Sequence, residues 1–109
     1  MLKRKYRLGL KIRPRFERSF KTPYFILKVA KNNLLYNRYG FIVSKKIDKR
    51  AVVRNKIKRL IRGGVEDLTI DLKEGYDVVF IAVKNIENLS KEEVKKIQRD
   101  LFSKEGLLK

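Results

Sequence analysis

Apolar residues alternate with other residues in three segments of the chain, as they do in β-strands. Residues 24–31 place Phe25, Leu27 and Val29 on one side of an extended chain, and residues 38–44 alternate in the same way. In residues 76–83 both alternating sets are apolar. The first two segments are therefore predicted strands, and the third is a predicted strand in the interior of a sheet.

Two further segments have the spacing of helices, residues 44–62 and the last segment, which follows Ser90. Within residues 44–62, apolar side chains recur every three or four positions, which predicts an amphipathic helix. We expect Gly63 and Gly64 to stop or loosen it. Its polar side carries a stripe of basic and amide side chains, namely Arg54, Asn55, Lys58, Arg59 and Arg62.

The last helix has signals at both ends. Ser90 suits the N-cap position and Glu93 completes a capping box, while Gly106 suits the position that follows the C-terminus.

A short helix is also expected over residues 14–21. Pro14 favours a first helical turn, and Phe16 and Phe20 are four residues apart, on one face of a helix. Pro23 would end this helix.

The resulting order of elements, α-β-β-α-β-α, predicts an α+β protein: a two-layer α/β sandwich with a small mixed sheet. The 109 residues are enough for one domain, residues 1–109, in which we expect residues 1–12 to be a flexible basic N-terminal arm. The sequence contains no apolar run of transmembrane length, no secretory signal and no Cys. The expected location is therefore the cytoplasm.

The charge of the chain is concentrated in two blocks. Lys and Arg number 29 against 12 Asp and Glu, for a formal net charge of +17. Residues 1–21 and 45–62 each contribute nine basic side chains and one acidic one. Two basic blocks on a nearly neutral remainder indicate a surface for a polyanion, with nucleic acid first and an anionic membrane second.

The chain has no His and no Cys. It therefore lacks the side chain best suited to proton transfer at neutral pH, the thiolate nucleophile and the commonest metal ligands. The Asp and Glu residues show no paired spacing typical of a metal site. Protein-centred catalysis is thus not expected.

Residues 40–62 resemble the motif of the bacterial ribonuclease P protein component. The matching residues are Val43-Ser44-Lys45-Lys46, Ala51-Val52 and Arg54-Asn55-x-x-Lys58-Arg59-x-x-Arg62. The similarity continues more weakly in Phe16 to Phe20, in the strand that begins at Tyr24 and in the strand that begins at Tyr76. The resemblance implies a ribosomal-protein-S5-domain-2-like fold.

In that family, an RNA subunit removes the 5′ leader of precursor tRNA with Mg²⁺, and the protein binds both the catalytic RNA and the leader. The resemblance implies the same partners here, with RNA rather than DNA or membrane, Mg²⁺ held mainly by the RNA, and no catalytic or metal-binding residue in this chain. The implied RNA-binding residues are Lys45, Lys46, Arg54, Asn55, Lys58, Arg59 and Arg62. The implied leader-binding cleft consists of Phe16, Phe20, Ile26 and Lys28, since aromatic faces stack on unpaired bases and cations neutralise phosphates.

Several alternatives stay open at the level of sequence. Phe16 and Phe20 could belong to the core, and Ile26 and Lys28 could serve packing alone. The segment between Phe20 and Tyr24 is short for the family, so a small strand there is expected to be missing. As a whole, the chain could instead be a small ribosomal or other structural RNA-binding protein, or a metal-dependent nuclease that uses acidic residues.

Overall fold

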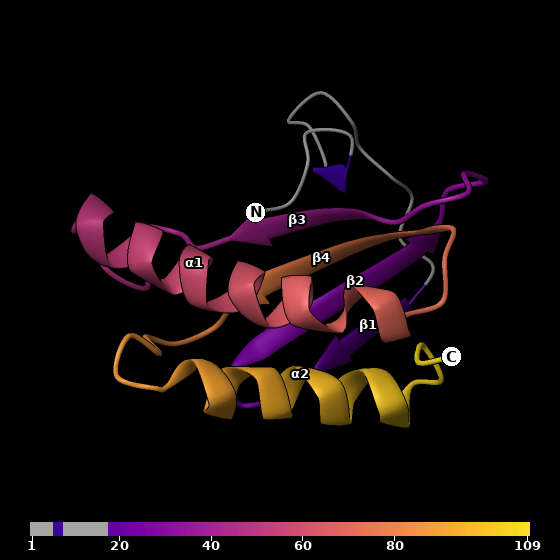
Figure 1. Cartoon of the computed structure of the whole chain (residues 1–109). Coiled ribbons are helices and arrows are strands. Elements are labelled where there is room, and N and C mark those ends of the chain that lie inside the picture. Colours follow the sequence, from indigo (N-terminus) through magenta and orange to yellow (C-terminus); the bar gives the residue numbers. More distant parts are fainter. Residues whose placement is uncertain (1–5, 8–17) are drawn as a thin grey trace.

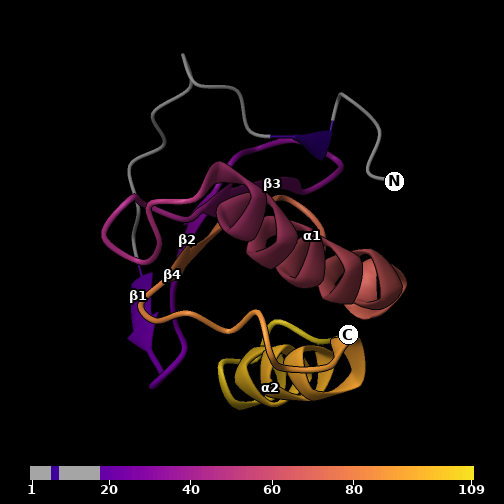
Figure 2. The ribbon, with the colours of Figure 1, turned by 90° about the vertical axis from the view of Figure 1, so that its left-hand side faces the viewer.

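The computed structural model describes residues 6–7 and 18–109, which form a four-stranded sheet and two long helices (Figure 1). Figure 2 shows both helices on the same side of the sheet. The predicted two-layer α+β architecture is thereby confirmed. The elements are β1 (Arg18–Lys21), β2 (Phe25–Lys31), β3 (Arg38–Ile42), α1 (Ala51–Leu68), the 3-10 turn η2 (Thr69–Asp71), β4 (Tyr76–Ala82) and α2 (Lys91–Lys104).

The sheet is mixed, with the strand order β1-β2-β4-β3. Strand β2 is antiparallel to both β1 and β4, whereas β3 is parallel to β4. A parallel pair needs a long crossover connection, and α1 supplies it between β3 and β4. As predicted from its two apolar faces, β4 lies in the interior of the sheet.

The core lies between the sheet and the two helices. Phe25 of β2, Phe80 of β4 and Phe102 of α2 are fully buried, and their rings meet edge to face with centroids 5.7 Å apart in each contact. Edge-to-face contacts of this kind stabilise aromatic clusters beyond their burial. The alternation of β2 decides which side faces this core, because Leu27 and Val29 are buried there as well.

The prediction of a helix over residues 14–21 is wrong for residues 18–21, the part of it that the structure describes. Residues 18–21 form β1, an edge strand in which Phe20 pairs with Leu27 of β2, whereas Phe16 lies outside the described residues. The turn after β1 explains the difference. The hydroxyl of Thr22 accepts hydrogen bonds from the backbone N–H groups of Tyr24 and Phe25, so Pro23 sits in a hairpin turn rather than after a helix.

Strand β1 ends at Lys21, and residues 22–24 form the turn into β2, so the short stretch between Phe20 and Tyr24 holds no separate strand. The predicted flexible arm, residues 1–12, lies mostly outside the described residues. Within it, Arg7 forms an isolated parallel bridge with Tyr39 of β3.

Helix α1 continues past the two glycines at which it was expected to stop or loosen. Gly63 and Gly64 lie inside it, and Val65 and Leu68 beyond them are completely buried. Two glycines in a helix interior cost about 2 kcal/mol relative to alanines. Burying one Val and one Leu side chain contributes about 3–6 kcal/mol, which exceeds that cost.

Gly64 is also the point of close contact between the two helices. A Cβ atom at this position would lie 1.9 Å from Oε1 of Gln98, a buried residue of α2. The amide group of Gln98 donates a hydrogen bond of 2.9 Å to the carbonyl of Ile61 in α1. Only glycine therefore leaves room for this link.

Helix α2 begins and ends as its sequence predicts. The Ser90 side chain accepts a hydrogen bond from the backbone N–H of Glu93, and Gly106 follows the helix with a φ of 71°. Of the helices that the structure describes, none combines the length and apolarity required to cross a bilayer.

We expect the two adjacent glycines to respond in opposite directions to alanine. Gly64→Ala should lower the free energy of unfolding by about 1–3 kcal/mol, because the new methyl group collides with the Gln98 amide. Gly63→Ala should raise it by up to about 1 kcal/mol, because alanine favours the helix and the nearest obstacle is the flexible Lys91 side chain at 3.3 Å. Urea denaturation measures both, and equal effects of the two substitutions would contradict this account.

Candidate nucleic-acid interface

The polar side of α1 presents a basic ridge, defined as Arg54, Asn55, Lys58, Arg59 and Arg62. The opposite side of the helix is buried against the sheet and α2 through Val53, Ile57 and Ile61. Asn55 and Arg59 are exposed, whereas the other three residues are half-buried along the flank of the helix. The amphipathic pattern predicted from sequence is thus confirmed, and the cations are held on one surface.

One end of the basic ridge is supported by an aromatic ring. The guanidinium carbon of Arg62 lies 5.8 Å from the centroid of Phe41 in β3. This cation–π contact orients Arg62 along the edge of the sheet. The ridge therefore runs beside β3, an outermost strand of the four-stranded sheet.

The other end of the ridge joins the loop between β3 and α1, where Lys45 and Lys46 are both exposed. Arg54 is tied to this loop, because one of its guanidinium nitrogens donates to the backbone carbonyls of Asp48 and Lys49 at 3.0 and 2.7 Å. The structure thereby places the seven residues implied as RNA-binding on one helix and the loop that leads into it.

The loop contains one carboxylate, that of Asp48. Hydrogen bonds from the Arg50 side chain and backbone lower the pKa of Asp48 from 3.8 to about 2, because they favour its charged form. Asp48 is therefore ionised at neutral pH beside the cations of the ridge.

The implied leader-binding residues do not come together as one cleft. Because Phe20 pairs with Leu27 in the register of β1 and β2, it faces the helices. Ile26 and Lys28 alternate with Leu27 and face the opposite way. The expected cleft is therefore wrong in placing Phe20 on the same surface as Ile26 and Lys28. Its fourth residue, Phe16, lies outside the described residues.

Ile26 and Lys28 belong to the outer face of the sheet, the face turned away from α1 and α2. Strand register aligns its side chains in two rows across the sheet, Lys21-Ile26-Ile81-Ile42 and Ser19-Lys28-Val79-Gly40. Ile42 is 50% exposed at the β3 edge. The outer face thus combines lysines with aliphatic side chains, of which Ile42 is exposed and Val79 is buried.

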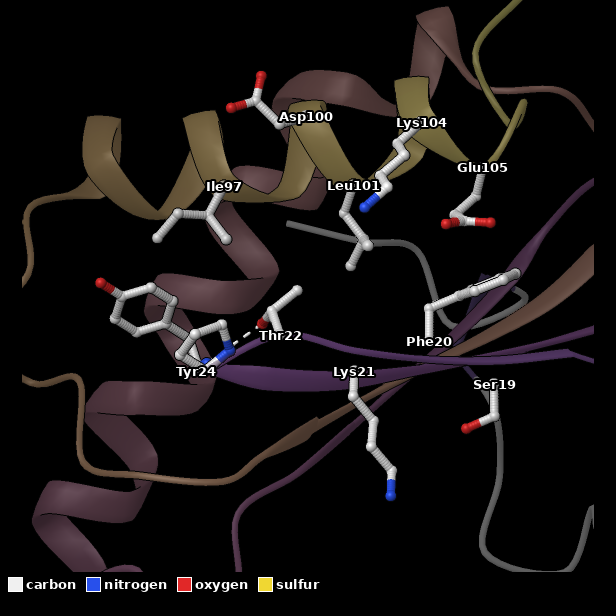
Figure 3. Close-up of a pocket in the computed structure, with 11 residues that line it drawn as sticks. Ser19, Phe20, Lys21, Thr22, Tyr24, Ile97, Asp100, Leu101, Lys104 and Glu105 are labelled. Atoms are coloured by element: carbon white, nitrogen blue, oxygen red, sulfur yellow. Dashed lines mark hydrogen bonds between the residues drawn. The ribbon is translucent and has the colours of Figure 1, made fainter.

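Phe20 instead lines a pocket of about 480 Å³ between the β1–β2 hairpin and α2 (Figure 3). Ile97 and Leu101 of α2 contribute apolar wall, and Asp100 and Glu105 add two carboxylates. Figure 3 shows Phe20 directed toward α2 and Lys21 directed away from it. Lys104 also lines the pocket and offsets one of these charges, so the pocket lacks the concentrated positive charge of the basic ridge.

An ion pair between β3 and β4 joins these two strands at one end of the outer face. Arg38 of β3 donates two hydrogen bonds of 2.8 Å to the carboxylate of Asp77, which is almost fully buried in β4. The Asn32 amide donates to the same carboxylate at 3.1 Å. The hydrogen bond to Asp77 raises the pKa of Arg38, and the two side chains form an ion pair within the sheet.

The sequence analysis did not predict that Phe41 and Asp48 support the basic surface. Nothing in the sequence connects Phe41 with Arg62, since their contact depends on how α1 packs beside β3. Asp48 had a signal, because it is the single acidic residue among residues 45–62. A single carboxylate among nine cations indicates that it forms a specific ion pair within the protein.

These features define a class, a small basic α+β domain that displays a cationic helix face to a polyanion. A family model described as Ribonuclease P matches residues 4–106. The ribonuclease P protein component of Clostridium botulinum (strain 657 / Type Ba4) is 38% identical over 91 residues, which cover 83% of this chain and 81% of that protein. The counterpart from Thermoanaerobacter sp. (strain X514) is 36% identical over 90 residues, covering 83% and 77%. The chain belongs to the ribonuclease P protein family.

Solved structures agree with this assignment. The RNase P protein from Thermotoga maritima has a TM-score of 0.70 at 27% identity and covers 77% of this chain and 79% of its own. The Staphylococcus aureus RNase P protein has a TM-score of 0.72 over 84% of each chain, and at 24% identity it shows the shared fold. The alternative of a ribosomal or other structural RNA-binding protein is not favoured.

We expect reversal of two ridge charges to weaken RNA binding and to flatten its salt dependence. Lys58→Glu combined with Arg59→Glu should lower the slope of log K against log [salt] by about 0.7 to 0.9 for each phosphate that the protein no longer neutralises. Fluorescence anisotropy with a ribonuclease P RNA over a series of salt concentrations measures this slope.

The matched control reverses two exposed lysines of α2, Lys96→Glu with Lys104→Glu, and so lowers the net charge equally. It should retain most of the slope. Equal losses in the two double variants would show that binding depends on total charge and not on the basic ridge.

Proposed function

We propose that this protein is the accessory subunit of ribonuclease P that assists removal of the 5′ leader from precursor tRNA, while the RNA subunit performs the chemistry. The observation that carries the proposal is the basic ridge of α1 in a chain that belongs to this family. The absence of His and Cys from the sequence supports a binding role, because proton transfer at neutral pH has no ready carrier here.

In this proposal the basic ridge and its loop bind the catalytic RNA. Arg and Lys neutralise phosphates and release condensed counterions, and Asn55 adds a directional donor and acceptor. The residues involved are Lys45, Lys46, Arg54, Asn55, Lys58, Arg59 and Arg62.

The outer face is the proposed path of the precursor leader. It offers Lys28 for phosphate and Ile26 as an apolar neighbour for unpaired bases, whereas the pocket beside Phe20 carries the carboxylates of Asp100 and Glu105. Lys104 offsets one of these carboxylates and the other still repels phosphates, so single-stranded RNA should favour the outer face over that pocket.

Magnesium enters the proposal as an ion held mainly by RNA. Among residues 6–7 and 18–109, no three acidic side chains gather into a metal-binding group. Asp48 and Asp77 are each engaged by an arginine instead. When bound in the holoenzyme, Mg²⁺ would stabilise the phosphate charge that develops during hydrolysis. The cytoplasm is the expected place of this reaction.

Reconstitution tests the proposed function directly. The protein should accelerate removal of the leader by the ribonuclease P RNA of Clostridium botulinum at low Mg²⁺, measured in single-turnover reactions with a labelled precursor tRNA. The protein without RNA should release no product at any pH, because it has no neutral-pH proton carrier and its described residues hold no carboxylate cluster for metal ions. Tight RNA binding without acceleration would favour a structural RNA-binding protein, and cleavage by RNA-free protein would favour a nuclease.

A second experiment distinguishes the two faces of the sheet. Lys28→Ala on the outer face should weaken binding of a precursor with a long leader by about 1 kcal/mol, roughly fivefold, and leave binding of leaderless tRNA unchanged. Lys104→Ala at the rim of the pocket removes the same charge and should affect neither substrate. A leader-dependent loss in Lys104→Ala alone would place the leader beside Phe20. Both variants are assayed in the assembled holoenzyme.

A further inference from the structure

Asp48 is the one acidic side chain in a block of nine basic residues, and both of its carboxylate oxygens are occupied. Oδ1 accepts hydrogen bonds from the backbone N–H of Arg50 at 2.8 Å and from its Nε at 3.0 Å. Oδ2 accepts from Nη2 of Arg50 at 2.8 Å and from the amide of Asn85 at 3.2 Å. The carboxylate thus closes the end of its own loop and reaches a second one.

The second loop connects β4 with α2, far from Asp48 in the sequence. Asn85 lies in it, and its side-chain oxygen accepts the backbone N–H of Glu87 at 2.8 Å. The Glu87 carboxylate in turn lies 3.6 Å from Nη2 of Arg50. Four side chains therefore connect the loop before α1 to the loop before α2.

The same short segment determines where Arg54 points. The carbonyls that accept hydrogen bonds from Arg54 belong to Asp48 and its neighbour Lys49. Any shift of the backbone at Asp48 would release the guanidinium of Arg54 and reorient the loop that presents Lys45 and Lys46. A loop whose backbone is already fixed loses less conformational entropy on binding RNA, so its cations are presented at a smaller entropic cost.

We propose that Asp48, through Arg50 and Asn85, is a positioning residue that holds the basic loop and Arg54 in the geometry that binds RNA. The inference rests on the proposed function, because it assumes that this surface binds ribonuclease P RNA. Asp48 does not itself contact the RNA in this proposal.

The proposal predicts an effect opposite in sign to that of charge alone. A carboxylate beside the phosphates of RNA repels them, so its removal should strengthen binding if Asp48 served no other purpose. If Asp48 positions the loop, its removal should weaken binding even though the protein becomes more positive. No other acidic residue of the block can mask this difference.

The test compares two substitutions that each remove one negative charge, Asp48→Asn and Asp100→Asn. Asp100 is exposed on α2, and among the described residues it makes no ion pair. We expect Asp48→Asn to bind ribonuclease P RNA about tenfold more weakly, the scale of one charge-assisted contact. Its salt slope should fall, because Arg54 no longer aligns with a phosphate. Asp100→Asn should bind as tightly as the unchanged protein or slightly more tightly.

A second variant breaks the same link without changing charge. Asn85→Ala should also weaken RNA binding, and the double variant with Asp48→Asn should be no weaker than Asp48→Asn alone, since both act through one connection. Circular dichroism and thermal unfolding confirm the fold of each variant. Should Asp48→Asn fail to fold, Asn85→Ala decides the question alone.

The outcomes separate the inference from the function on which it rests. Absence of salt-dependent RNA binding by the unchanged protein would overturn the proposed function. Binding by the unchanged protein, together with equal or tighter binding by Asp48→Asn and Asn85→Ala, would overturn only the positioning role.

Discussion

The contact of α1 with α2 at Gly64 is the constraint on which the rest of the structure depends. Because Gly64 has no side chain, the Gln98 amide reaches the backbone of α1 and bonds to the Ile61 carbonyl. This link and the buried residues around it fix the rotation of α1 about its axis. That rotation determines where the basic ridge lies, which is on the flank of α1 beside β3. A binding surface made of long, flexible cations thus gains its order from a contact on the opposite side of the same helix.

The charge of +17 would oppose a compact fold if it were spread through the structure. In the fold, some arginines form ion pairs with carboxylates of the protein, whereas other cations remain available at the surface. Arg38 neutralises buried Asp77, and Arg50 neutralises Asp48, so these arginines stabilise the sheet and the loop. The cations of the basic ridge and its loop lie at the surface, some exposed and some half-buried, where a polyanion can reach them. This division explains how a strongly basic chain remains folded and still offers a surface for RNA.

The two faces of the sheet differ in the same physical terms. The inner face packs against the helices, and a pocket lined by Asp100, Glu105 and Lys104 lies between α2 and the β1–β2 hairpin. The outer face carries lysines among aliphatic side chains and has no helix over it in the described part of the chain. This difference in charge is the reason that the outer face, and not the pocket, is the proposed path of the precursor leader.

The sequence by itself determined the elements whose signals are local. The alternation of β2 and the two apolar faces of β4 predicted strands and their burial, and the caps at Ser90 and Gly106 predicted the ends of α2. The polar stripe from Arg54 to Arg62 predicted the basic ridge, because a helix of 3.6 residues per turn gathers those positions whatever it packs against.

Only the tertiary structure decided the features that depend on contacts between distant residues. Phe20 lies in a strand because β2 offers it an edge to pair with, although its spacing from Phe16 also suits a helix. Gly63 and Gly64 stay inside α1 because burial of Val65 and Leu68 outweighs the low helix propensity of glycine. The link from Asp48 to Asn85 joins residues 37 positions apart, and no local pattern shows it. Local periodicity fixes which side chains share a face, whereas packing between elements decides which face becomes the core and which remains for a ligand.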